Sequence, residues 1–108
     1  MQIKKTYSEV NPELLNAEIK DFILKQGATL GEDKLETYTL PDQSASFITR
    51  STMTFTISGK ECLRVHVVGS ARSETKLMID VDDKLFPREK LSALESDIDF
   101  IFSSYEVK

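Results

Sequence analysis

Apolar and polar residues alternate with a period of two along three stretches in the middle of the chain, 46–58, 62–69 and 75–82. Such alternation, in segments rich in Thr, Val, Ile and Phe, is typical of β-strands with one buried face. The expected core face carries the apolar residues Phe47, Met53, Phe55, Ile57, Leu63, Val65, Val67, Leu77, Ile79 and Val81. A weaker alternation over 35–40, closed by a Pro-Asp turn, predicts a fourth strand.

Two other stretches have helical periodicity. Asn11 and Pro12 suit a helix N-cap and the first helical position, and Gly27 suits the residue that ends a helix. We therefore predict a helix over 12–26, with an apolar stripe of Leu15, Ile19, Phe22 and Ile23. A second stripe predicts a helix over 87–103 and consists of Leu91, Leu94, Ile98, Ile101 and Phe102.

The predicted fold class is α+β, with the order α-β-β-β-β-α. Two amphipathic helices and one apolar sheet face fit a two-layer sandwich, in which a four-stranded antiparallel sheet has both helices on one face. Residues 28–34, 41–45 and 70–74 are expected to be loops, and residues 1–10 have no pattern that assigns a conformation. We expect a single domain over 1–108, because a chain of this length has material for one core.

The register of the predicted hairpin around Gly59 depends on its turn. A two-residue Gly59-Lys60 turn would place Ile57 opposite Cys62 and mismatch the two apolar faces. Matching the faces requires a loop over 59–61 or a bulge. The loop pairs Ile57 with Leu63, Phe55 with Val65, and Met53 with Val67. The next hairpin is expected to pair Val67 with Leu77, Val65 with Ile79, and Leu63 with Val81.

The second sheet face has no remaining segment to cover it. The predicted register arranges on it the rows Thr56–Arg64–Asp80, Thr54–His66–Met78 and Thr52–Val68–Lys76. We expect this face to bind a partner, because its threonine-rich strand is uncharged and two apolar side chains are set among polar ones. Threonine also suits strands by propensity, so a plain solvent-exposed face explains the pattern equally well. The predicted binding residues are Thr52, Thr54, Thr56, Arg64, His66, Val68, Met78 and Asp80.

Three ionisable residues, Arg64, His66 and Asp80, are expected on adjacent strands of this face. As cross-strand neighbours, Arg64 and Asp80 are more simply explained by an ion pair than by a ligand site. His66 is the single histidine, and Thr54 beside it does not supply the orienting group that a catalytic base needs. The sequence favours a non-enzymatic interaction module. A small-ligand-binding protein or degenerate enzyme with a site around these three residues is the alternative.

No cofactor and no metal site is predicted. Asp80, Asp82 and Asp83 lack the spacing of a calcium loop. Cys62 and His66 would lie about 13 Å apart along one strand, too far to share a metal ion. The sequence also lacks a phosphate-binding or dinucleotide-binding glycine motif.

The net charge of −4 argues against non-specific binding to nucleic acid or to an anionic membrane. A local basic patch is conceivable from Arg50, Lys60, Arg64, Arg72 and Lys76, but an RNA-binding sheet needs aromatic side chains that this face lacks. The absence of an apolar leader or membrane-spanning run, with a single cysteine, predicts a cytoplasmic protein. The expected partner is a second copy bound through the open sheet face in a two-fold arrangement, or another protein.

Overall fold

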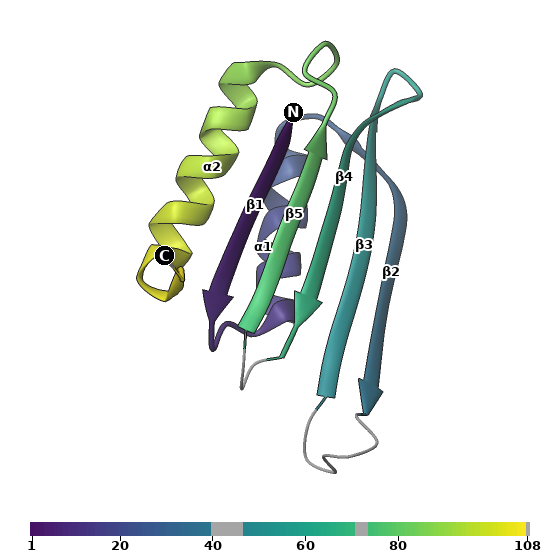
Figure 1. The fold of residues 1–108 in the computed structure, drawn as a ribbon. Coiled ribbons are helices and arrows are strands. Elements are labelled where there is room, and N and C mark those ends of the chain that lie inside the picture. The colour runs from purple at the N-terminus through teal and green to yellow at the C-terminus, as the bar shows by residue number, and fades with distance from the viewer. Residues whose placement is uncertain (40–46, 71–73, 108) are drawn as a thin grey trace.

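The computed structural model describes residues 1–39, 47–70 and 74–107. Its elements follow the order β1 (Gln2–Ser8), α1 (Pro12–Lys25), β2 (Thr29–Thr39), β3 (Phe47–Ile57), β4 (Lys60–Gly69), β5 (Glu74–Val81) and α2 (Arg88–Phe102), with a 3-10 helix over Ser103–Tyr105. The strands form one antiparallel sheet in the order β1-β5-β4-β3-β2, and both helices lie on one of its faces (Figure 1). The α+β class is confirmed. The prediction of four strands is wrong, because the described residues form five.

β1 is the strand that the sequence pattern did not predict. It pairs with β5 from Gln2 opposite Asp80 to Ser8 opposite Glu74. Ile3 and Tyr7 are buried, but the inward-facing position between them is Lys5, which interrupts the apolar alternation. The Lys5 ammonium is neutralised by the carboxylates of Asp99 and Glu106, at 3.0 and 3.1 Å. These partners lie at the other end of the chain, so no local pattern could indicate them.

β2 begins at Thr29, within the segment expected to be a loop. The register with β3 shifts between Leu30 and Asp33, so the strand contains a bulge. Asp33 pairs opposite Met53 on the helix-covered side, and the ammonium of Lys20 from α1 lies 2.7 Å from its carboxylate. The bulge and the inward-facing charge of Asp33 interrupt the alternation of apolar and polar residues, so the sequence pattern did not predict this half of β2.

The β3–β4 hairpin turns at Ser58 and Gly59, both at positive φ (54° and 79°), as a two-residue hairpin turn requires. Ile57 therefore pairs with Lys60, and a register shift next to Cys62 brings the apolar faces back together. Beyond that shift Phe55 pairs with Leu63 and Met53 with Val65, so the predicted pairs Ile57–Leu63, Phe55–Val65 and Met53–Val67 are wrong. The predicted β4–β5 register is confirmed at all three pairs. The expected loop 41–45 lies outside the described residues.

Both predicted helices are present. Asn11 caps α1, since its side-chain oxygen accepts hydrogen bonds from the N–H groups of Glu13 and Leu14 at 2.8 and 3.4 Å. Gly27 follows the helix at a φ of +94°, which favours glycine. The Lys90 ammonium from α2 donates to the Gln26 carbonyl at 2.6 Å, placing a cation at the negative end of α1.

The core lies between the helices and the sheet. Phe55 and Val65, both expected on the core face, are fully buried there. The rings of Tyr7 on β1 and Phe102 on α2 pack against each other, with their centroids 5.8 Å apart. The side chain of Phe47, also expected in the core, lies outside the described residues.

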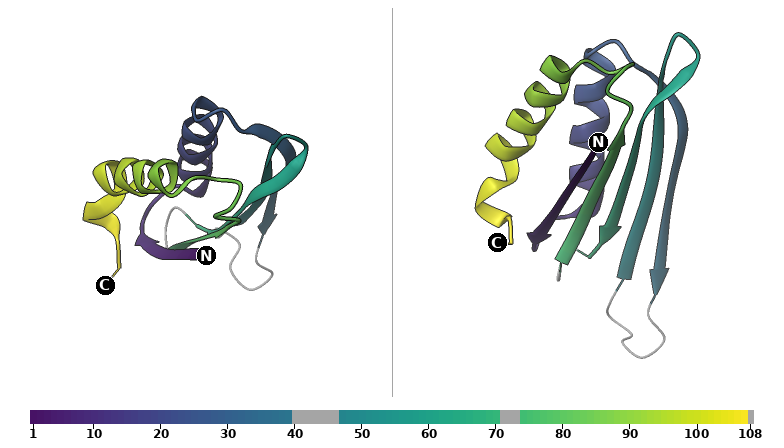
Figure 2. Two further views of the ribbon diagram at one scale, coloured as in Figure 1. Left: turned by 90° about the horizontal axis from the view of Figure 1, so that it is seen from above. Right: turned by 45° about the horizontal axis from the view of Figure 1, so that its top comes forward.

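Figure 2 shows that the sheet bends around the two helices, so its uncovered face is on the outside of the curve. None of the helices in the described ranges is long and apolar enough to cross a membrane.

Candidate functional site: the open sheet face

We use the name open face for the side of the sheet away from the helices. Its central rows are Thr54–Arg64–Asp80–Gln2, Thr52–His66–Met78–Lys4 and Arg50–Val68–Lys76–Thr6. The neighbours on β4 and β5 are those predicted. The β3 residues of these rows differ from the predicted ones. The β3–β4 hairpin turns at Ser58 and Gly59, one residue earlier than a Gly59-Lys60 turn would, and it contains a bulge. Thr56 consequently lies opposite Glu61, outside these rows.

Thr54 is buried, with 7% of its surface exposed, although it lies on the open face. Its hydroxyl oxygen accepts a hydrogen bond of 2.7 Å from the N–H of Glu32, within the β2 bulge. A Cβ atom on Gly31 would stand 2.7 Å from the same oxygen, so the bulge closely covers this side chain. Thr54 therefore supports the bulge and is poorly placed to contact a partner.

Arg64 and Asp80 are cross-strand neighbours as predicted, but each has a different polar partner. Arg64 forms an ion pair of 3.0 Å with Glu61 on its own strand, and this hydrogen bond raises the pKa of the guanidinium. The Asp80 carboxylate accepts a hydrogen bond of 2.8 Å from the Gln2 amide. The two groups thus do not form the ion pair that the register suggested.

His66 lies in the middle of the open face, half-buried. The nearest polar side chain recorded for its ring is Thr52, whose hydroxyl oxygen is 3.4 Å from Nδ1, rather than the predicted Thr54. No described carboxylate hydrogen-bonds to the ring. A histidine with one threonine neighbour lacks the orienting group that a catalytic base normally has.

A basic band crosses the open face, formed by Lys4, Lys34, Arg50, His66 and Lys76. It encloses two half-buried apolar side chains, Val68 and Met78. Among the residues that the structure describes, Lys4, Arg50 and Lys76 form no ion pair. Glu61 and Asp80 lie nearer the β3–β4 turn, whereas Glu36, opposite Arg50, and Glu74, two residues before Lys76 on β5, lie beside the band on the same face.

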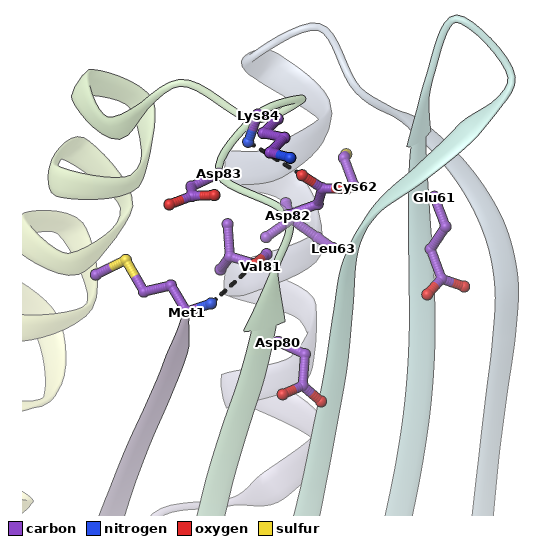
Figure 3. Close-up of a pocket in the computed structure, with 9 residues that line it drawn as sticks. All are labelled: Met1, Glu61, Cys62, Leu63, Asp80, Val81, Asp82, Asp83 and Lys84. Atoms are coloured by element: carbon purple, nitrogen blue, oxygen red, sulfur yellow. Dashed lines mark hydrogen bonds between the residues drawn. The ribbon is translucent and has the colours of Figure 1, made fainter.

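A hollow of about 540 Å³ adjoins the open face at the end of β5 (Figure 3). Its lining is Met1, Glu61, Cys62, Leu63, Asp80, Val81, Asp82, Asp83 and Lys84. The labelled carboxylates do not converge on one point in Figure 3. Within the described residues there is no group of three or more His, Cys, Asp or Glu side chains that could hold a metal ion.

Cys62, the buried free thiol beside this hollow, lies 3.4 Å from the Phe55 carbonyl, to which it can donate a weak hydrogen bond. Burial raises its pKa, and the negative charges of Asp82 and Glu61 raise it further. The thiol therefore stays protonated at neutral pH and is a poor nucleophile.

No family model, curated protein or solved structure matches this chain. Its function can therefore be inferred only from its own sequence and geometry.

Sequence reasoning missed part of the basic band. Lys4 was missed because β1 was not predicted, and Lys34 because β2 was expected to begin after it. The spacing of Ile3 and Tyr7, with polar residues at positions 4 and 6, was the available signal for β1. Arg72, the remaining member of the basic patch conceivable from the sequence, lies outside the described residues.

Proposed function

We propose that this chain is a non-enzymatic interaction module that binds a partner protein through the open face. The observation that carries the proposal is the basic band. Cations without an ion-pair partner in the described part of the chain surround Val68 and Met78, although the protein has a net charge of −4. A partner with acidic side chains around an apolar contact complements this surface.

A second copy docked by the same face has less support than an acidic partner. Direct face-to-face stacking would bring the two basic bands together, and like charges across an interface disfavour association. An offset two-fold arrangement would place the band of one copy over Glu61 and Asp80 of the other. Self-association through this face is therefore a distinct outcome of the test below.

A small-ligand site around Arg64, His66 and Asp80 remains the alternative, with less support. Arg64 and Asp80 are each hydrogen-bonded elsewhere, and only Asp80 lines the hollow. The open face also lies on the outside of the bent sheet, whereas small-ligand sites are usually concave.

Binding of nucleic acid stays disfavoured. Tyr38, at the β2 margin, is the one tyrosine or phenylalanine among the described side chains of the open face, which leaves no platform for base stacking. A cytoplasmic location remains a prediction from the sequence.

The test compares two Lys→Glu variants. Lys76 lies in the basic band, and Lys60 lies at the β3–β4 hairpin, outside it; both are exposed. The immobilised chain is incubated with an extract of the source cells. Retained proteins are identified by mass spectrometry, and the affinity of the purified partner is then measured. We expect Lys76→Glu to weaken binding about tenfold or more and Lys60→Glu to leave it nearly unchanged.

Binding should also weaken as salt concentration rises, because the contacts are electrostatic. Equal affinity of the Lys76→Glu variant and the original chain, or the lack of any saturable partner, would contradict the proposal. Retention of the chain itself, lost in Lys76→Glu, would instead favour self-association through the open face.

A further inference from the structure

The two edges of the sheet differ in how they are covered. At the β1 edge, the Val107 N–H donates a hydrogen bond of 2.8 Å to the Thr6 carbonyl, and Tyr7 forms a bridge with Glu106. At the opposite edge, no described element pairs with the outer side of β2 (Figure 1). The outer main-chain groups of β2 are therefore available to another strand.

The second half of β2 has the geometry that strand pairing needs. The bulge is confined to the stretch before Asp33, and from Asp33 to Thr39 every residue pairs in regular register with β3. Two large side chains in this half, Leu35 and Tyr38, are 45% and 47% exposed. A regular, unbulged edge with exposed apolar side chains is a surface on which a further strand can add.

We propose that two copies of this chain pair through the outer edges of β2, antiparallel, about a two-fold axis that passes next to Leu35. The sheets of the two copies then form one continuous sheet with all helices on the same side. This interface lies along the β2 edge and shares only Lys34 with the basic band, and it does not depend on the function proposed for the open face.

The charges along β2 are self-complementary in this arrangement. Lys34 of each copy lies opposite Glu36 of the other copy. Opposite charges facing each other across a strand pair stabilise the pairing. On the helix-covered side, Leu35 meets Leu35 of the second copy, so the exposed apolar side chains contact each other at the axis.

Neighbouring registers lack this complementarity. A two-fold arrangement that keeps each side chain on its own face must be centred on a residue. Centring it on Lys34 or on Glu36 sets two like charges against each other. Centring it on Asp33 brings the bulged part of the strand into the pairing.

The side chains concerned are solvent-exposed, and their contacts within this chain are with exposed neighbours on the same strand. Lys34 is 69% exposed, and its ammonium is 3.5 Å from Glu32. Glu36 accepts a hydrogen bond from the exposed Tyr38 hydroxyl. Asp33, which points toward the helices, is already neutralised by Lys20 and would face Thr37 of the second copy rather than another carboxylate.

A charge-swap experiment tests this register by sedimentation equilibrium of the full chain up to millimolar concentration. The original chain is expected to dimerise. Lys34→Glu and Glu36→Lys should each be monomeric, because each places like charges across the axis. Mixing these two variants should produce a heterodimer, and the double variant should dimerise again. Lys76→Glu, on β5, is the matched control and should leave the dimer unchanged.

Cysteine cross-linking supplies a second measurement that also captures a weak dimer. In Leu35→Cys the two thiols would lie directly across the axis, within disulfide distance, whereas in Thr37→Cys they would be displaced along the strands. Under mild oxidation the first variant should cross-link and the second should not. A monomer at every concentration without cross-linking of Leu35→Cys would overturn the proposal, as would a dimer unaffected by either charge reversal. Circular dichroism checks that each variant is folded.

Discussion

Adjacent residues on β3 have different roles, because successive side chains of a strand point to opposite faces. Phe55 is fully buried in the core, so Phe55→Ala should lower the free energy of unfolding by about 3–5 kcal/mol. Thr54→Ala removes the acceptor of the Glu32 N–H and should cost about 1 kcal/mol. Urea denaturation measures both values. Equal losses would mean that the faces of β3 have been assigned wrongly.

Tyr7 combines complete burial of the residue with a hydroxyl that has no hydrogen-bond partner among the described residues. Removing an unsatisfied buried hydroxyl while keeping the ring should be favourable. We therefore expect Tyr7→Phe to raise the free energy of unfolding at neutral pH by about 1 kcal/mol. Tyr105→Phe, at a half-exposed tyrosine, is the matched control and should have little effect. A loss of stability in Tyr7→Phe would reveal a hydrogen bond of the Tyr7 hydroxyl.

Tyr7 also predicts a pH dependence. Burial raises the pKa of Tyr7 to about 12; the Lys5 charge opposes this, and Glu106 and Asp99 add to it. In the unfolded chain the Tyr7 hydroxyl loses its proton near pH 10, roughly the ordinary tyrosine value. Between about pH 10 and pH 12 the folded state therefore binds more protons than the unfolded state. The resulting stability is present below about pH 10 and should be lost as pH rises toward 12. Denaturation across this range should show a steeper loss in the original chain than in Tyr7→Phe.

At the scale of elements, the contact between α1 and α2 contains two carboxyl groups. Burial raises the pKa of Glu18. A hydrogen bond with Asp97 and the negative charge of Asp97 raise this pKa further. One carboxylate oxygen of Asp97 is buried without a hydrogen-bond partner in the described part of the chain. Because the folded-state pKa of Glu18 is raised, this pair favours the folded state at acidic pH, and the benefit is lost as pH rises.

Asp97→Asn removes the repulsion between these helices at neutral pH. We expect a gain in stability of a few tenths of a kcal/mol at pH 7, which should shrink on acidification as Glu18 binds a proton in the original chain. Asp99→Asn is the matched control on the same helix, and it should destabilise the protein because Asp99 is an ion-pair partner of Lys5. A neutral or negative effect of Asp97→Asn at pH 7 would exclude repulsion at this contact.

At the scale of the whole molecule, the C-terminal segment covers the outer edge of β1, the first strand of the chain, by hydrogen bonding to it. Val107→Pro removes the N–H that donates to the Thr6 carbonyl, and it should lower the free energy of unfolding by about 1 kcal/mol. Val107→Ala keeps this N–H and serves as the control. Hydrogen exchange of the β1 amides should become faster only in the proline variant. Unchanged exchange in that variant would mean that the bridge does not protect this edge.

The sequence alone specifies the two helices, the strands β3 to β5 and the face of each of these strands that is buried. It also determined the β4–β5 register. These features follow from interactions between residues that are close in the sequence. They are the apolar periodicity, the Asn11 cap, the glycine at position 27 that ends α1, and the matching of apolar faces across the β4–β5 connection. The identity of the open face followed as well, since no further segment was left to cover it.

Features whose cause lies far away in the chain follow only from tertiary contacts. β1 and the first part of β2 carry the inward-facing charges Lys5 and Asp33, which are neutralised by residues of other elements. Local patterns treat a charge at a core position as evidence against a strand, so both were missed. The bulge near Cys62 set the β3 rows of the open face, and the β2 bulge buried Thr54. The basic band is complete only because β1 and β2 bring Lys4 and Lys34 onto the surface that carries Arg50, His66 and Lys76, which no local pattern specifies.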